Sequence, residues 1–374
     1  MKILFPISTF YPVQEGGPNF TLFWHCKELV KNNIDVTIIS TNTGFDSIKG
    51  ELPPVNIFKS TDMGNIIYLS GRFKFLRQLY NVYSCLDKVD VIHLNSFFSP
   101  ISFISFLMIK IFKNNKKIIW STRGEMNTKA LEFNSIQKKI VISFLKLFIN
   151  KVKFHSTSDQ ETLDINKILK KKDIQQIPNL IEFDEKIIAK TTNNLLFIGR
   201  IHPIKCVENL ISALSQSKLF KNSNFKLLIV GNCEERHKPY LNFLKKLISE
   251  LNLENKIEFK SHIKGAEKLN IYSSSKFTFL PSHSENFGNV VVESMSQGTP
   301  VVASKGTPWQ DLNSFNAGFH VSNDSFSLAE IIDRIISMND IEYNSYRKNC
   351  YNFAKQNFDI SNRIEEWISI YKKS

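Results

Sequence analysis

Cysteine is scarce in this chain of 374 residues, and no two of its five cysteines lie close together in the sequence. A secreted disulfide scaffold and a structural zinc site both need cysteines at short, regular spacings, so neither is expected. The amino-terminal segment also lacks a long apolar core followed by a cleavage site, and it is typical of a first strand instead. We therefore expect a cytoplasmic protein. The five cysteines are Cys26, Cys85, Cys206, Cys233 and Cys350.

Long hydrophobic runs and glycine-rich loops are missing as well. The most apolar stretch, residues 97–112, contains Lys110 and is too short to span a bilayer comfortably. The Gly16-Gly17-Pro18 turn is no G-x-G-x-x-G fingerprint, which argues against an NAD oxidoreductase. No internal repeat or low-complexity tract is visible.

Acidic residues are outnumbered, with 35 Asp and Glu against 48 Lys and Arg, for a net charge of +13. The excess lies mainly in residues 1–180, which hold 24 basic and 14 acidic side chains. A basic half suggests an anionic partner, such as a membrane surface, a nucleic acid or a phosphorylated substrate. A solvated lysine-rich surface is an equally open interpretation. Because no RNA- or DNA-binding module is recognisable, nucleic-acid binding is a remote alternative.

Apolar residues, by contrast, make up 42% of the chain, enough for a full core in each of two domains. Apolar runs alternate with helical patterns in both halves, which predicts an α/β protein built from βαβ units. Residues 181–193 are polar and loosely patterned, and we place the linker there. We expect one domain over residues 1–180, a second over 181–355, and a helix over 356–374 that returns to the first domain.

The stretch from Pro281 to Pro300 holds two carboxylates, Glu285 and Glu293, around a turn of small and polar residues. The pattern predicts a strand, a loop and then a helix. A helix that opens after a buried strand can hold a phosphate, because its first N–H groups and its dipole attract anions. Gly288 permits close approach of a ligand. Glu293, within the helix, could accept hydrogen bonds from ribose hydroxyls, and Glu285 would lie nearer a sugar.

Two cations follow another predicted strand in the second half. Arg200 and Lys205 come just after Gly199, and such a pair suits a diphosphate, since Arg binds as a fork and Lys as a point charge. In the first half, the turns at residues 16–18 and 122–125 also follow predicted strands, where open α/β sheets bind ligands. We interpret His93, at the end of a strand, as structural.

Residues 135–153 are predicted to form an amphipathic helix with an apolar stripe and several lysines. Such a helix can lie on an anionic bilayer. The alternative is that the stripe packs on its own sheet and the lysines are merely solvated. The stripe consists of Ile136, Ile140, Phe144, Leu147 and Phe148, and the lysines are Lys138, Lys139, Lys146, Lys151 and Lys153.

Several motifs together carry a family resemblance. In the second half they are FIGRIHPIK (197–205), the E-x7-E element of ENFGNVVVE (285–293), QGTPVVAS (297–304) and KGTPWQDL (305–312). GGP (16–18), STRG (121–124) and IPN (177–179) match more loosely in the first half. With them the chain resembles a retaining glycosyltransferase of the large GT4 group, and KGTPWQDL is similar to enzymes that build bacterial surface polysaccharides.

The resemblance implies the GT-B fold, with two Rossmann-like domains whose parallel sheets face each other across a cleft. The first domain would bind the acceptor and the second the nucleotide sugar. Glu285 and Arg123 would be the catalytic residues, although the family often has a histidine where this chain has Arg123. The residues implied to bind the donor are Gly17, Arg200, Lys205, Asn286, Phe287, Gly288, Asn289 and Glu293.

The implied reaction moves a hexose or N-acetylhexosamine from a UDP- or GDP-linked donor to a hydroxyl of a lipid-linked glycan, as in the synthesis of polysaccharide, lipopolysaccharide O-antigen or capsule. The anomeric configuration is retained, and the leaving phosphate assists deprotonation of the acceptor. The absence of Asp-x-Asp agrees with a site that needs no metal, and no cofactor is implied. A same-fold epimerase or phosphorylase is the alternative. Residues 135–153 would let the enzyme bind the inner face of the cytoplasmic membrane peripherally.

Overall fold

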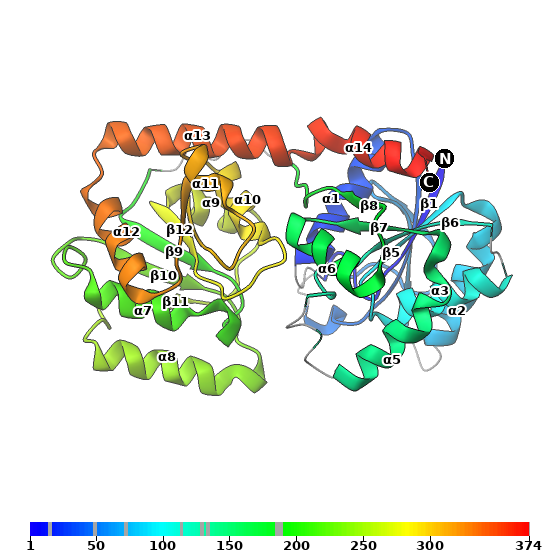
Figure 1. Ribbon diagram of the computed structural model, residues 1–374, viewed down its shortest axis with the longest axis horizontal. Coiled ribbons are helices and arrows are strands. Elements are labelled where there is room, and N and C mark those ends of the chain that lie inside the picture. Colours follow the sequence, from blue (N-terminus) through cyan, green and yellow to red (C-terminus); the bar gives the residue numbers. More distant parts are fainter. Residues whose placement is uncertain are drawn as a thin grey trace. The chain divides into compact units, whose positions relative to one another are not determined.

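The computed structural model describes residues 1–13, 17–47, 51–70, 74–112, 115–127, 131, 135–183 and 190–373. The chain forms two compact units, one comprising Met1–Glu182 with Ile360–Ser374 and the other Phe183–Asp359. Each unit is an α/β layer structure with its own sheet (Figure 1). The unit boundaries fall after residues 182 and 359, where the sequence predicted 180 and 355.

The sheet of the first unit has the strand order β3-β4-β2-β1-β5-β6-β7-β8, and all its neighbouring strands run parallel except β3 and β4. The order reverses between β1 and β5, and ligands bind at such a switch point in open α/β sheets. The strands are β1 (Lys2–Pro6), β2 (Asp35–Thr41), β3 (Lys59–Thr61), β4 (Gly64–Leu69), β5 (Val91–Asn95), β6 (Lys117–Ser121), β7 (Val152–Ser156) and β8 (Ile174–Gln176).

Helices cover both faces of this sheet, and two core clusters show which helices lie on which face. One face packs against α2, α3, α5 and α6, and the other against α1 and α14, which lie side by side (Figure 1). The helices are α1 (Gly17–Lys31), α2 (Lys74–Cys85), α3 (Pro100–Phe112), α5 (Ser135–Lys146), α6 (Asp159–Leu169) and α14 (Ile360–Lys373), with short 3-10 turns η1 (Phe45–Ser47), η2 (Leu86–Lys88) and η3 (Ile149–Lys151).

The second unit has a fully parallel sheet in the order β11-β10-β9-β12-β13-β14, with its switch point between β9 and β12. Its strands are β9 (Asn194–Ile198), β10 (Lys226–Val230), β11 (Ile257–Lys260), β12 (Phe277–Leu280), β13 (Val301–Ser304) and β14 (Gly318–Val321). Its helices are α7 (Val207–Gln216), α8 (Lys238–Glu250), α9 (Gly265–Ser274), α10 (Asn289–Ser296), α11 (Asp311–Ser314), α12 (Ser325–Ser337) and α13 (Asp340–Phe358), with η4 (Pro203–Lys205) and η5 (Glu235–His237).

Two apolar stretches form helices with narrower bounds. Within residues 97–112 the helix begins at Pro100, because the proline ring suits the first helical position and disfavours helix in the residue before it. The helix expected over 135–153 ends at Lys146, since Val152 is needed in β7, where it pairs with Ile118. The β3–β4 hairpin and β8 had no counterpart in the prediction.

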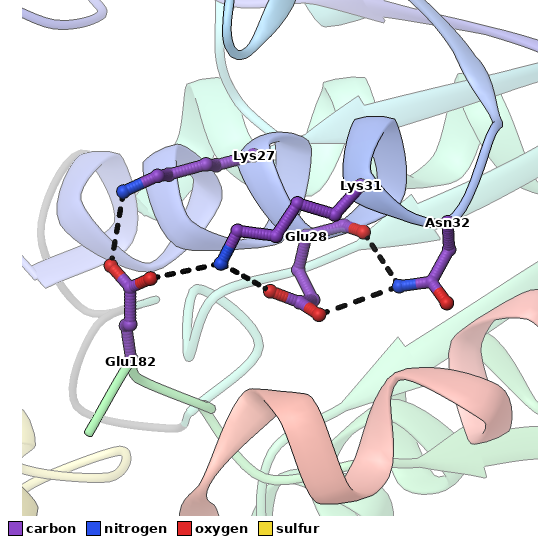
Figure 2. A network of polar contacts seen from close by, with 5 residues as sticks. All are labelled: Lys27, Glu28, Lys31, Asn32 and Glu182. Atoms are coloured by element: carbon purple, nitrogen blue, oxygen red, sulfur yellow. Dashed lines mark hydrogen bonds and ion pairs between the residues drawn. The ribbon is translucent and has the colours of Figure 1, made fainter. Parts of the chain in front are cut away.

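Glu182, at the point where the chain leaves the first unit, is bound to α1 by an ionic network (Figure 2). Glu182 accepts hydrogen bonds from Lys27 at 3.2 Å and from Lys31 at 2.9 Å, and Lys31 also binds Glu28 at 3.0 Å. The two lysines lower the pKa of Glu182, although burial opposes them. The chain re-enters this unit beside the same point, where the Ile360 amide donates to the Ile181 carbonyl at 2.9 Å.

None of the helices in the described parts of the chain combines the length and the apolar character that crossing a bilayer requires.

Candidate active site

The loops that follow β9 and β12 meet at the switch point of the second sheet. The first contains η4 and ends at Lys205, and the second runs over residues 281–288. The two are joined by a backbone hydrogen bond of 2.8 Å, in which the His283 amide donates to the Ile204 carbonyl. Both loops leave the carboxyl ends of neighbouring parallel strands, so their side chains converge on one edge of the sheet.

Lys205 and Glu285 form an ion pair at this edge. Both side chains are largely buried, with 15% and 16% of their surfaces exposed. The Ser282 hydroxyl donates to the same carboxylate oxygen at 3.1 Å, and the Glu285 amide donates to the Gly306 carbonyl at 3.1 Å. Glu285 is thus held through its side chain and through its backbone amide. The family resemblance assigned both residues to the site of the nucleotide sugar, but the sequence did not predict that they would bind each other.

Helix α10 opens beside this pair. Its cap residue, Gly288, has a φ of +84°, and a Cβ there would lie 2.9 Å from Leu280 Cδ2. Leu280 and Trp309 fill the space that a Cβ would need, so packing and the positive φ both require glycine at this position. The first turn of the helix supplies N–H donors to an anion. The Phe287 ring is buried against Trp309, whose indole N–H donates to the Phe287 carbonyl at 2.5 Å. A ligand can therefore reach Phe287 through its backbone but not through its ring.

A third loop, after β13, packs against the loop of residues 281–288. The Ser304 hydroxyl donates to the Ser282 carbonyl, and a Cβ at Gly306 would lie 2.2 Å from the His283 carbonyl oxygen. Only glycine allows the backbones of these two loops to approach so closely. This contact explains the glycine of the KGTPWQDL motif in physical terms.

Glu293, the other carboxylate of the motif, lies on α10 and is bound from α9. It accepts hydrogen bonds from the Lys268 ammonium at 2.7 Å and the Tyr272 hydroxyl at 2.8 Å, both on the same oxygen. Burial and, after it, the negative charge of Glu293 raise the pKa of Tyr272. Neither partner was predicted, although their spacing of four residues puts them on one face of a helix.

Arg200, predicted to share a diphosphate with Lys205, has a different environment. Its side chain is 63% exposed and forms an ion pair of 3.4 Å with Glu234. Arg236 binds the same carboxylate at 2.7 Å. The structure thus places Lys205 within the loop junction and Arg200 on the surface of the same unit.

In the first unit, Arg123 follows β6 with a φ of +56°. Its guanidinium donates to the Asn95 side-chain oxygen at 2.7 and 3.2 Å and to that of Asn179 at 3.1 Å. Glu161 holds the turn around it, accepting from the Thr122 hydroxyl at 2.7 Å and the Gly124 amide at 2.6 Å. Burial lowers the pKa of Arg123. The Arg123 guanidinium is thus held by two asparagine side chains, and Glu161 holds the turn that carries it.

The predicted Gly-Gly-Pro turn is described only in part. Gly17 is the first residue of α1, and its carbonyl accepts from the Thr21 hydroxyl at 2.9 Å. Gly16 lies outside the described residues.

A buried chain of hydrogen bonds runs behind the turn of Arg123. The Nε2 of His155 faces the Ile177 carbonyl, which can only accept, so Nε2 carries the proton and Nδ1 accepts from Ser121. The Ser121 oxygen then accepts from His93 Nε2, and His93 Nδ1 accepts from the Tyr371 hydroxyl. His25 donates in turn to Tyr371 at 3.2 Å. His93 is therefore part of the interior, in keeping with a structural role.

Three or more His, Cys, Asp or Glu side chains that could hold a metal ion together are not found among the residues with described positions.

Comparison with known proteins identifies the second unit. Residues 180–357 match the family model "Glycosyl transferases group 1". They form a group 1 glycosyltransferase domain. The chain is accordingly an enzyme of the glycosyltransferase class, and the match covers the loop junction of Lys205 and Glu285 together with α10.

Longer similarities extend over the whole chain. An uncharacterized glycosyltransferase of Methanocaldococcus jannaschii is 24% identical over 406 residues, covering 100% of this chain and 98% of that protein. Sucrose-phosphate synthase of Thermosynechococcus elongatus has a TM-score of 0.77 at 18% identity, with 100% and 98% of the two chains covered. HepE of Anabaena, in complex with UDP and glucose, has a TM-score of 0.75 at 19% identity, with 99% and 100% covered. These structures are similar in fold, and the fold is GT-B.

Proposed function

We propose that the enzyme is a retaining glycosyltransferase of the GT4 group that moves a hexose or N-acetylhexosamine from a nucleotide diphosphate sugar to a hydroxyl of a lipid-linked glycan. The product would belong to a surface polysaccharide, an O-antigen or a capsule. The observation that carries the proposal is the Lys205–Glu285 pair, enclosed at the switch point and beside the start of α10. A switch point next to a helix amino terminus is a place where a phosphate-bearing ligand binds.

The diphosphate would take over the charge that Glu285 now supplies to Lys205. The Lys205 ammonium then stabilises the leaving group, and the backbone N–H groups of residues 286–289 add further donors. Glu285, freed from the lysine, accepts from hydroxyls of the donor sugar. Because both side chains are already largely buried, this exchange takes place in a low dielectric, where it is stronger than in water.

Glu293 would bind the ribose. One of its oxygens is engaged by Lys268 and Tyr272, and that contact fixes the direction of the carboxylate before a ligand arrives. Arg200 stays in the proposal as a more peripheral phosphate contact, since its long exposed side chain can leave Glu234 at little cost.

A UDP-linked donor is the first to test. The solved complex of HepE holds UDP and glucose, and that protein covers nearly the whole of this chain in fold. GDP-linked sugars are the second choice. The sugar, the acceptor and the linkage depend on the shape of the pocket and need a screen of donors and acceptors.

The acceptor would be reached at a membrane surface. The apolar stripe of residues 135–153 supports this, because Ile136, Ile140 and Leu147 are exposed and do not pack on the sheet. We therefore propose peripheral binding through residues 135–153, with the anionic inner leaflet as the surface.

The proposal is tested by Lys205→Met and Glu293→Ala, assayed for sugar transfer from a panel of UDP- and GDP-linked donors. We expect each variant to lose activity on the order of 100-fold, because a buried partner of the donor is removed. Lys238→Met, which removes an exposed lysine of the same unit, is the matched control and should retain activity.

Binding of UDP or GDP, measured by thermal shift, separates loss of binding from loss of chemistry. Full transfer activity in either Lys205→Met or Glu293→Ala would contradict the assignment of the site.

A further inference from the structure

Helix α5 has two apolar sides, and only one of them packs on the protein. Ile142 and Leu145, with Ile149 just beyond the helix, are buried in the core of the first unit. Ile136 and Ile140, on the opposite side, are 74% and 64% exposed. The core therefore does not need the second side, and its exposure has no structural purpose within this unit.

The neighbouring helices α2 and α3 show the same feature. Leu76, Tyr80 and Tyr83 recur along α2 and are exposed, although Val82 on the same helix is fully buried. At the end of α3, Ile111 and Phe112 are exposed as well. Isolated apolar residues on a surface are ordinary, but eight on three adjoining helices, with two more just after α5, are not.

These side chains belong to one layer. Helices α2, α3 and α5 all pack into the same core cluster and so cover one face of the sheet. The Tyr83 and Phe112 rings lie 5.6 Å apart, which joins α2 to α3, and the Phe103 and Phe144 rings lie 6.3 Å apart, which joins α3 to α5. We call the outward side of this layer the three-helix platform. It consists of Leu76, Tyr80, Tyr83, Ile111, Phe112, Ile136, Ile140, Phe144, Leu147 and Phe148.

The charge on these helices has one sign. The segments of α2, α3 and α5 contain no aspartate or glutamate. Their basic residues include Lys110 on α3, whose pKa is lowered by burial and then by the positive charges of Lys151 and Lys171. The platform is thus bordered by cations close enough to repel each other. The lysines on α3 and α5 are Lys110, Lys138, Lys139 and Lys146, and Lys151 follows shortly after α5.

We propose that the three-helix platform docks on the surface of an anionic lipid bilayer. Its aliphatic and aromatic side chains enter the interface between headgroups and acyl chains, and its lysines bind the anionic headgroups. Tyr80 and Tyr83 suit this position, because a tyrosine ring has an apolar body and a polar tip. The inference deepens the membrane contact proposed for residues 135–153, and it rests on that proposed function by adding α2 and α3 to the contact.

A second copy of the chain is the other conceivable occupant, and the charges disfavour it. A twofold contact brings the same patch of both subunits together, so the lysines of one copy would face the lysines of the other. An anionic surface instead neutralises them and releases counterions. Phosphatidylglycerol vesicles supply this chemistry without any sugar acceptor.

The test compares the full chain with one triple variant. This variant carries Tyr80→Ser, Ile111→Ser and Phe112→Ser, all of which lie outside residues 135–153. Co-sedimentation is measured with vesicles of phosphatidylglycerol and phosphatidylcholine, and with phosphatidylcholine alone. We expect the unchanged protein to bind the anionic vesicles, and the variant to bind them about tenfold more weakly. Phe326→Ser with Ile341→Ser removes exposed apolar side chains of the second unit and should leave binding unchanged.

Thermal unfolding and sedimentation velocity accompany the assay. The three changed side chains are exposed, so the variant should fold normally and bind UDP or GDP as before. Equal vesicle binding by the variant and the unchanged protein would overturn the proposal, and so would a dimer that the variant abolishes. If the unchanged protein does not bind UDP or GDP, the proposed function is refuted, and vesicle binding stands as a separate result.

Discussion

Among single residues, Gly306 sets the position of residues 281–288, the loop that carries Glu285. A Cβ at this position would lie 2.2 Å from the His283 carbonyl oxygen and 3.0 Å from that of Ser282. Both atoms belong to backbone, so the clash cannot be relieved by rotating a side chain. The loop that carries Glu285 would have to move away.

Gly306→Ala should therefore lower activity by about tenfold or more, since a shift near 1 Å in a positioning loop has effects of this size or larger. The measurement is kcat and KM for the donor, with thermal unfolding to show that the fold persists. Gly265→Ala is the control, because a Cβ at Gly265 meets nothing within 4 Å, although its φ of +56° adds some backbone strain. Equal activity of Gly306→Ala and the unchanged enzyme would refute this role.

The sequence predicted candidate residues of the site but not the partners that they bind in the structure. Glu285, Glu293 and Lys205 could be selected because each stands at a fixed distance from a strand end or within a helix. The bond between Lys205 and Glu285 could not be foreseen, as it joins residues 80 positions apart. Contact between loops depends on which strands are neighbours in the sheet, and one sequence does not reveal that.

Among the helices, α14 shows how a distant segment completes a core. Its buried residues Ile360, Ile364, Trp367 and Tyr371 recur every three or four positions, which is the spacing of one helix face. Trp367 packs between the rings of His25 and His155, each with its centroid 4.5 Å away. The helix thus closes the first unit from the far end of the chain.

Trp367→Ala should destabilise the first unit by about 3–5 kcal/mol, the usual loss for a buried tryptophan. Equilibrium unfolding in urea measures the change, and Trp367→Phe should lose clearly less because it keeps part of the packing. A loss below about 1 kcal/mol for the alanine variant would show that α14 is only loosely attached.

Across the whole molecule, the two units should respond differently to acid. Burial lowers the pKa of His155 to about 4, and it lowers the pKa values of His25 and His93 well below their ordinary value. The positive charge of Arg123 acts in the same direction on all three, whereas Glu161 opposes it at His155. The folded first unit therefore keeps three neutral histidines in its interior.

The sign of the effect follows from proton binding. Above pH 6.5, the approximate pKa of an unfolded histidine, both states are neutral and stability is unaffected. Between about pH 6.5 and 4 the unfolded chain binds a proton at His155 that the folded unit does not bind, so the stability falls as the pH decreases. His25 and His93 act in the same direction. Acid therefore destabilises the folded form.

At pH 5.5 the first unit should be less stable than at pH 7.5, by on the order of 1 kcal/mol from His155 alone, and His25 and His93 add to the loss. Hydrogen exchange in β5, β6 and β7 should accelerate after correction for the intrinsic rate. Strands β9, β10 and β12 provide the internal control, because this cluster lies outside their unit. Equal acceleration in both sheets would contradict the claim that the buried histidines make the first unit sensitive to acid.

The sequence by itself determined the α/β class, the succession of strands and helices, and the loops that carry the candidate site. These features depend on the spacing of apolar residues and on turn residues, which are local properties. Only the tertiary structure decided that Glu293 is held by Lys268 and Tyr272, and which side of α5 is buried. A helix with two apolar sides can pack through either one, and the choice depends on the area and shape of the sheet beneath it.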